Sequence, residues 1–202
     1  MHQKKIVMVD LLIMVLSLAM YRVLPLHTQG FAPMLGISIF AGAVIPNKKL
    51  AVALPLLSML LSDFIFQFLF IKGITSLAGF YQGQWINYIL FALLVIFGFP
   101  MKKVNTKSVL LFSISGSLLY FIVSNLVVWA THTGFSRPMT FEGLTMCYAD
   151  ALAFYRDFGL VKGFEANFVL GDLIWSCLIF SAYYLFIKKA SATKIVVQYN
   201  QV

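Results

Sequence analysis

The stretch Leu54–Phe70, LPLLSMLLSDFIFQFLF, sets one carboxylate, that of Asp63, in an otherwise apolar run. A charge in the hydrocarbon core of a bilayer is costly, so such residues are rare and usually pair with another group or line a functional pathway. Asp63 is therefore the first candidate for a functional residue, provided that the run around it lies in a membrane.

The composition places the chain in a lipid bilayer. Of 202 residues, 61% are hydrophobic and 11% are charged, which is more apolar surface than one soluble core of this length can bury. The net charge of +8 comes from small basic groups beside apolar runs, so nucleic acid is not expected as a partner. The sequence predicts one all-α integral membrane domain over residues 1–202.

Apolar runs recur along the whole chain. A helix needs about 20 residues to cross a bilayer. Spans are expected at Ile6–Leu26, Leu50–Lys72, Gln84–Met101, Ser108–Ala130 and Gly163–Ile187. Phe31–Val44 is shorter and is either a re-entrant segment or a sixth span. We count it as a span. The pattern predicts a six-helix transmembrane bundle.

The short segment carries small residues at four-residue spacing, Ala32 with Gly36 and Ser38 with Gly42. Such pairs let a second helix approach closely. We expect this segment to be buried among its neighbours.

Basic residues are distributed unequally between the two sides of the predicted bundle. With six spans, one side holds Lys4, Lys5, Lys48, Lys49, Lys102, Lys103, Lys107, Lys188, Lys189 and Lys194, and the other holds Arg22, Lys72, Arg137, Arg156 and Lys162. Because cytoplasmic loops are enriched in lysine and arginine, the lysine-rich side and both termini are expected in the cytoplasm.

In this topology, polar residues of several spans gather in the outer layer of the bilayer. They are Arg22, Asp63, Asn125, Trp129 and Asp172. The asymmetry predicts an outward-facing pocket with these residues as substrate contacts. Structural alternatives remain open for all five: Arg22 and Asp63 pair to hold helices in register, Asn125 bonds across helices, Trp129 anchors at the interface, and Asp172 satisfies backbone donors at a kink.

The outer connection, residues 131–162, contains an amphipathic pattern. Within about Met139–Tyr155, Phe141, Tyr148 and Tyr155 recur at helical spacing. The helix is predicted to be a lid over the pocket, with Tyr148 as a further substrate contact and Phe141 and Tyr155 as gating residues; the alternative is a helix resting on lipid.

A shorter outer loop is expected to form a second gate. It carries Phe80 and Tyr81 among the glycines Gly73, Gly79 and Gly83, and glycine favours a mobile backbone.

Cysteine and histidine give no pattern of metal ligation. Cys147 and Cys177 are expected at different depths, and the histidines are scattered. No catalytic residue or cofactor is assigned, and any metal remains unknown.

The motifs FAPMLGISIFAGA, PLLSMLLSDF, SNLVVW, TFEGLTMCYADALAFY and LGDLIW, in this order, resemble an uncharacterised bacterial family of transport proteins. That family is distantly similar to the substrate-binding S components of energy-coupling-factor vitamin transporters. The resemblance implies an S-component-like bundle in the bacterial cytoplasmic membrane that takes up a vitamin or related micronutrient.

One departure concerns the coupling partner. S components that dock on an ATP-driven module typically carry Ala-x-x-x-Ala on the first helix, whereas VDLLIMVLSLAMYRVL lacks it. Docking on such a module is therefore in doubt. A solitary transporter, similar to small cobalamin-transporting relatives of S components, is the other possibility, with Cys147 as a soft cobalt ligand.

Two further classes of function stay open. Asp63 and Asp172 are candidates for an acid/base pair of an intramembrane enzyme, which requires mutual reach and a water path. The chain is alternatively a structural subunit of a membrane assembly, which needs no outer pocket.

Overall fold

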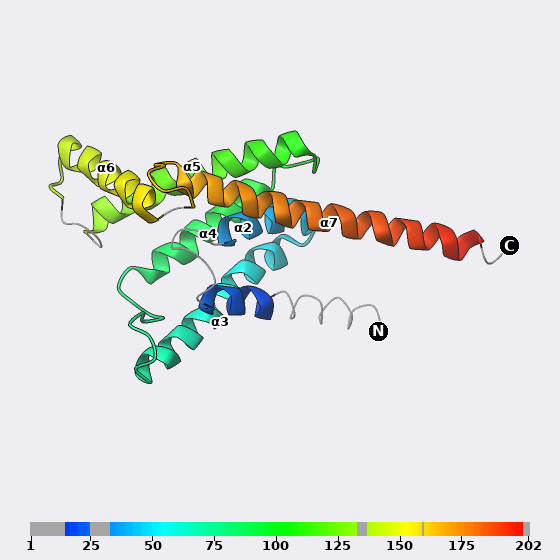
Figure 1. Cartoon of the computed structure of the whole chain (residues 1–202), viewed down its shortest axis with the longest axis horizontal. Helices are drawn as coiled ribbons and strands as arrows, with labels where there is room; N and C mark the ends of the chain where they lie inside the picture. The colour runs from blue at the N-terminus through cyan, green and yellow to red at the C-terminus, as the bar shows by residue number, and fades with distance from the viewer. Residues whose placement is uncertain (1–14, 25–32, 133–136, 159, 200–202) are drawn as a thin grey trace.

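The computed structural model describes residues 15–24, 33–132, 137–158 and 160–199, and these residues form helices and no strands (Figure 1). Side chains are described up to Leu185. The first helix is described over residues 15–23. It is followed by α2 (Met34–Val44), α3 (Lys48–Ile71), α4 (Gln84–Gly98), α5 (Thr106–Thr131), α6 (Phe141–Phe158) and α7 (Asn167–Tyr199).

Among the described residues, three helices are long and apolar enough to cross a membrane. They are Lys48–Ile71 with 24 residues, Thr106–Thr131 with 26 and the part of α7 over Asn167–Leu185 with 19. The apolar helices α2 and α4 are shorter, with 11 and 15 residues. The described part of the chain is thus all-helical, as expected, with three helices that could span a membrane, and the six-helix transmembrane bundle stays a prediction.

The expected boundaries differ from the observed ones mainly at the last span. Its helix begins at Asn167 rather than Gly163, because Gly163 has a φ of 81° and lies in a turn. Asparagine caps explain two other starts. Asn47 accepts hydrogen bonds from the backbone N–H groups of Lys49 and Leu50, and Asn105 accepts one from that of Ser108.

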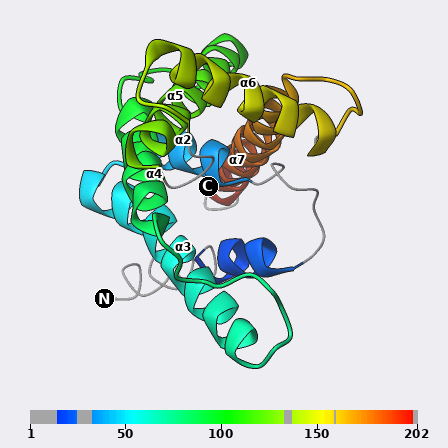
Figure 2. The same cartoon turned by 90° about the vertical axis from the view of Figure 1, so that its left-hand side faces the viewer.

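Helix α2 lies at the centre of the bundle, against α3, α4, α5 and α7 (Figure 2). Its Leu35 and Ile39 are buried in a core with Leu94 of α4 and Phe180 of α7. The expected burial of this segment is confirmed. Because protein surrounds it, a helix too short to cross a bilayer alone can still lie within the bundle.

Backbone contact between α2 and α4 depends on two glycines. A Cβ on Gly42 would lie 2.0 Å from the carbonyl oxygen of Val95, and one on Gly98 would lie 2.5 Å from that of Ile39. The Ser38 and Gly42 pair therefore permits the predicted close approach of a helix, and that helix is α4. Ala32, of the other pair, lies outside the described residues.

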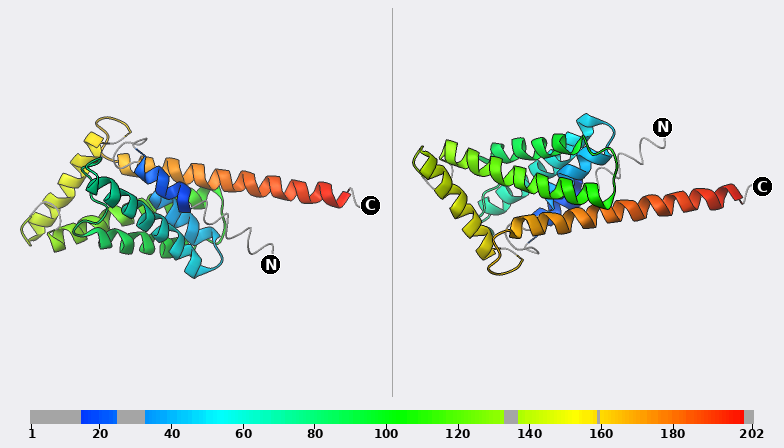
Figure 3. Two further views of the ribbon diagram at one scale, coloured as in Figure 1. Left: turned by 90° about the horizontal axis from the view of Figure 1, so that it is seen from below. Right: turned by 90° about the horizontal axis from the view of Figure 1, so that it is seen from above.

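Helix α6 crosses one end of the bundle, over the end of α5 and the start of α7 (Figure 3). The threonine before it, Thr140, caps the helix by accepting a hydrogen bond of 3.1 Å from the backbone N–H of Gly143. The amphipathic helix expected in the connection 131–162 is thus present, at Phe141–Phe158 rather than Met139–Tyr155.

Candidate functional site

Asp63 lies fully buried about two thirds of the way along α3, where its carboxylate joins three helices. One oxygen forms an ion pair with the guanidinium of Arg22, at the end of the first helix. The other accepts hydrogen bonds of 2.6 Å from Gln84 Nε2 and from the Tyr88 hydroxyl, both on α4. A buried carboxylate is stable only with such partners. Both oxygens are therefore occupied by protein groups.

Arg22 is also committed to α3. Its Nη1 donates to the Met59 carbonyl at 3.2 Å and to the Ser62 hydroxyl, and its guanidinium lies 5.8 Å from the centroid of the Phe66 ring. The pair required by the structural interpretation of Asp63 is thus present. With these contacts, Arg22 and Asp63 fix the first helix against α3.

The polar network continues from Gln84 toward α5. Asn87 Nδ2 donates to Gln84 Oε1 at 3.0 Å and to the Tyr81 hydroxyl at 2.9 Å. The hydroxyl of Tyr120 on α5 donates to Asn87 Oδ1 at 3.4 Å. Side chains thus link the Asp63 carboxylate to Tyr120 without a gap.

Tyr120 also lines a cavity of about 140 Å³ beside α6. Met34, Leu35, Phe91, Tyr155, Phe168 and Asp172 form the rest of its wall. The Ser117 hydroxyl donates to Asp172 Oδ2 at 2.6 Å and fixes the carboxylate. We refer to this space as the Asp172 cavity.

Aromatic rings close the Asp172 cavity. Phe91 stacks on Tyr120 with ring centroids 5.5 Å apart, and Tyr155 of α6 lies 4.9 Å from Phe168 of α7. Burial first, and the charge of Asp172 second, raises the pKa of Tyr155 to about 12. Its hydroxyl therefore stays protonated at neutral pH.

Three predicted substrate contacts lie elsewhere, along the junction of α5 with α6. Asn125 Nδ2 donates to the Phe121 carbonyl at 2.7 Å, Trp129 Nε1 to the Pro138 carbonyl at 2.9 Å and the Tyr148 hydroxyl to the Ile122 carbonyl at 2.8 Å. The last two bonds tie α6 and its leading loop to α5. The structure brings Arg22 and Asp63 together and places Asp172 in the cavity. Asn125, Trp129 and Tyr148 neither contact the Arg22–Asp63 pair nor line the cavity.

The predicted gating residues also have different surroundings. Tyr155 lines the cavity, whereas the Phe141 side chain is 81% exposed. The Phe80 ring lies 5.2 Å from Phe64, and its N–H donates to Gln67 Oε1 at 3.2 Å. Tyr81 belongs to the polar network. The shorter loop is thus packed on α3 in this conformation.

Cys147 is buried and donates a weak hydrogen bond to the Asn125 carbonyl at 3.7 Å. Burial raises the pKa of its thiol, which disfavours the thiolate that a soft metal ion binds. Within the described residues, histidine, cysteine and acidic side chains form no group of three that could hold a metal ion.

Several residues of the network were absent from the sequence prediction. They are Gln84, Asn87, Tyr88, Ser117 and Tyr120. A signal existed, since Gln84, Asn87 and Tyr88 share one face of α4 by their spacing, as do Ser117 and Tyr120 on α5. Uncharged polar residues are common in transmembrane helices, however, so this spacing alone does not single them out.

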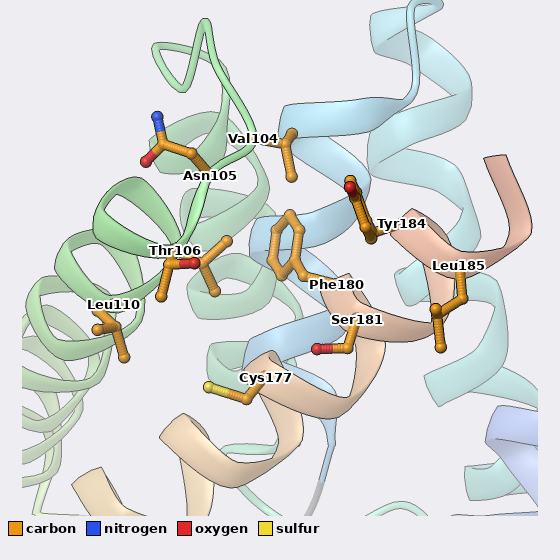
Figure 4. A pocket seen from close by; sticks show the side chains of 10 residues that line it. Val104, Asn105, Thr106, Leu110, Cys177, Phe180, Ser181, Tyr184 and Leu185 are labelled. Carbon is orange, nitrogen blue, oxygen red and sulfur yellow. The ribbon is translucent and has the colours of Figure 1, made fainter. Parts of the chain in front are cut away.

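A larger cavity, about 560 Å³, lies toward the other end of the bundle, between the start of α5 and the middle of α7 (Figure 4). Its walls include Val104, Asn105, Leu110, Phe180 and Tyr184, and none of the described side chains that line it is charged. Cys177 is in its wall, but none of the predicted substrate contacts is.

Comparison with known proteins identifies a family for the chain but no activity. No curated protein and no solved structure matches the chain. A family model, described as a family of unknown function (DUF6580), matches residues 2–195. The chain therefore belongs to the DUF6580 family.

Proposed function

We propose that the protein takes up a small molecule across a bacterial cytoplasmic membrane and binds it in the Asp172 cavity, beneath α6. The observation that carries the proposal is the wall of this cavity. It combines a carboxylate and hydroxyls with apolar surface, as ligand sites do. Through Tyr120 and Asn87 it also connects to the buried Asp63 network.

The volume of the cavity supports a lid function for α6. Ligand sites usually measure about 300–1,000 Å³, whereas this cavity measures about 140 Å³. Tyr155 comes from α6, so a shift of α6 enlarges the space and opens it. In this proposal the bonds of Trp129 and Tyr148 hold the closed position, and the conformation described above is the closed one.

We further propose an S-component-like bundle with six spans, α2 and α4 being short spans, and with both termini in the cytoplasm. The lysines at helix ends support this orientation. Because the first helix lacks Ala-x-x-x-Ala, we favour a transporter that works without an ATP-driven module. A vitamin or related micronutrient remains the proposed class of substrate.

The orientation predicts how introduced cysteines react in intact cells. In a Cys147→Ser, Cys177→Ser background, Glu142→Cys on α6 is expected to react with a membrane-impermeant maleimide, while Lys103→Cys in the α4–α5 loop reacts only after lysis. Both native side chains are exposed, so local burial does not decide the result. Labelling of Lys103→Cys from outside would contradict the orientation.

The binding function predicts a compound that co-purifies with the protein. Mass spectrometry of small molecules released from wild type is expected to find one that is depleted at least about tenfold in Asp172→Leu, since leucine of similar size removes the charge and the hydrogen bond. Asp157→Asn, at an exposed carboxylate of α6, is the matched control. Equal amounts in all three proteins, with equal thermal unfolding, would contradict binding in the Asp172 cavity.

The enzyme alternative receives less support. In the part of the chain that the structure describes, Asp63 and Asp172 share no hydrogen-bond partner, and both oxygens of Asp63 are occupied by Arg22, Gln84 and Tyr88. An acid/base pair needs mutual reach and free positions for water.

A further inference from the structure

The wall of the Asp172 cavity has an unusual composition for a ligand site. Of the seven described residues that line it, four are aromatic, namely Phe91, Tyr120, Tyr155 and Phe168, and Asp172 is the one charged residue among the seven. Ser117 is the only hydrogen-bond partner of Asp172 among the described side chains, and no lysine, arginine or histidine there forms an ion pair with it. The cavity thus holds a carboxylate that lacks a protein counter-charge in this part of the chain.

Both components of the wall attract the same kind of ligand. The face of an aromatic ring carries partial negative charge and attracts cations, most strongly where water is excluded. A carboxylate in a low-dielectric space attracts a cation by Coulomb interaction. An anion would meet repulsion from both, and a neutral ligand would leave the carboxylate unpaired.

We propose that the Asp172 cavity binds the ammonium group of a small organic cation, an inference that rests on the proposed function. Asp172, fixed by Ser117, is the counter-charge, and the rings contact the carbon atoms next to the nitrogen. The volume of about 140 Å³ is well below the roughly 300–1,000 Å³ of sites that enclose a whole ligand. It therefore accommodates a head group in the closed conformation rather than a whole vitamin-sized molecule.

A metal ion fits the same wall less well. Hard cations such as Ca²⁺ and Mg²⁺ take six or more oxygen ligands, whereas most of this wall is aromatic or aliphatic. The described residues also contain no group of three histidine, cysteine or acidic side chains. An alkylammonium ion needs one counter-charge and a set of rings, which the cavity provides.

The test compares ligands of similar shape and different charge. Calorimetry on the full chain in detergent at neutral pH would use choline and butylammonium, their neutral counterparts 3,3-dimethylbutan-1-ol and butan-1-ol, and the anion 3,3-dimethylbutanoate. We expect at least one cation to bind about tenfold or more tightly than its neutral counterpart, and the anion not to bind.

Substitutions in the wall test whether the preference for cations arises in the Asp172 cavity. Asp172→Asn is expected to abolish the preference for the cation, and Phe91→Leu to weaken cation binding several-fold while sparing the alcohols. Asp157→Asn, an exposed carboxylate on α6, should bind as wild type does. Thermal unfolding of each variant checks that it is folded.

The results that would contradict cation binding differ from those that would contradict the uptake function. Equal affinity for cations and alcohols, or a cation preference that survives in Asp172→Asn, would overturn the cation assignment and leave the uptake function standing. Absence of binding by both cations would also overturn it, and Asp172 is then better explained as a protonated, neutral group. The co-purified compound tests the uptake function independently of these probes.

Discussion

Asp63→Asn is expected to lower the free energy of unfolding by about 3–5 kcal/mol, the usual cost of removing one partner from a buried ion pair. The carboxylate is fully buried, and the Arg22 side chain is only 23% exposed. Asparagine keeps the shape but removes the charge, and it replaces one of the two accepting oxygens with an NH₂ group that only donates. The guanidinium of Arg22 is then left without a counter-charge beside the Phe66 ring.

The second half of this prediction is a rescue. Replacing Arg22 with Gln in the Asp63→Asn background removes the uncompensated charge, so the double variant should regain at least half of the lost stability. Thermal unfolding of the two single variants and the double variant, in one detergent, measures the coupling. Tyr88→Phe serves as a milder control because it removes one neutral donor to the same carboxylate.

The competing interpretation gives a different pattern. If Asp63 contacts substrate directly, Asp63→Asn folds normally and loses uptake, without rescue by Arg22→Gln. The bonds to Arg22, Gln84 and Tyr88 favour the destabilisation. We therefore place the substrate near Asp172 and assign to Asp63 the role of holding the first helix, α3 and α4 together.

Much of the fold follows from hydrophobicity alone. Spans such as Leu50–Lys72 and Ser108–Ala130 agree with α3 and α5 to within two residues at each end, because apolar runs and asparagine caps are local features. The amphipathic pattern likewise located α6. Residues before 15 lie outside the described chain, so the start of the first expected span at Ile6 stays a prediction.

The site was harder to predict because the depth of a residue in a bilayer does not fix the direction in which its side chain points. Asp63, Asn125 and Trp129 were expected to share an outer layer, yet the Asn125 amide turns back to its own helix and the Trp129 indole reaches Pro138. Residues at the same depth can point in different directions around their helix axes and so contact different neighbours. Periodicity gives the face of a helix but not which neighbour that face meets.

The close approach of α2 and α4 leads to the other large expected effect. Gly42→Ala places a methyl group where the carbonyl oxygen of Val95 lies 2.0 Å away, so α2 and α4 must separate. At an open helix position the same change would stabilise by about 1 kcal/mol. Here we expect destabilisation of about 3 kcal/mol or more, at or above the upper end of the cost of overpacking.

A series of glycine substitutions tests the geometry. Gly98→Ala meets the Ile39 carbonyl at 2.5 Å and should cost nearly as much. Gly36→Ala meets the Ser176 hydroxyl at 3.1 Å and the Ser176 backbone nitrogen at 3.2 Å, and it should cost least because a shift of a few tenths of an ångström relieves both contacts. Thermal unfolding in detergent gives the order. A Gly42→Ala variant as stable as wild type would contradict backbone contact between the two helices.

The same substitution connects packing to binding. Met34 and Leu35 line the Asp172 cavity from α2, and Phe91 lines it from α4, so separating these helices displaces two parts of the wall relative to each other. Gly42→Ala and Gly98→Ala are therefore expected to weaken ligand binding as well as stability. Their combination should cost less than the sum of the two, because the first methyl group has already moved α2 away from α4. Fully additive losses would indicate that each glycine faces a separate contact.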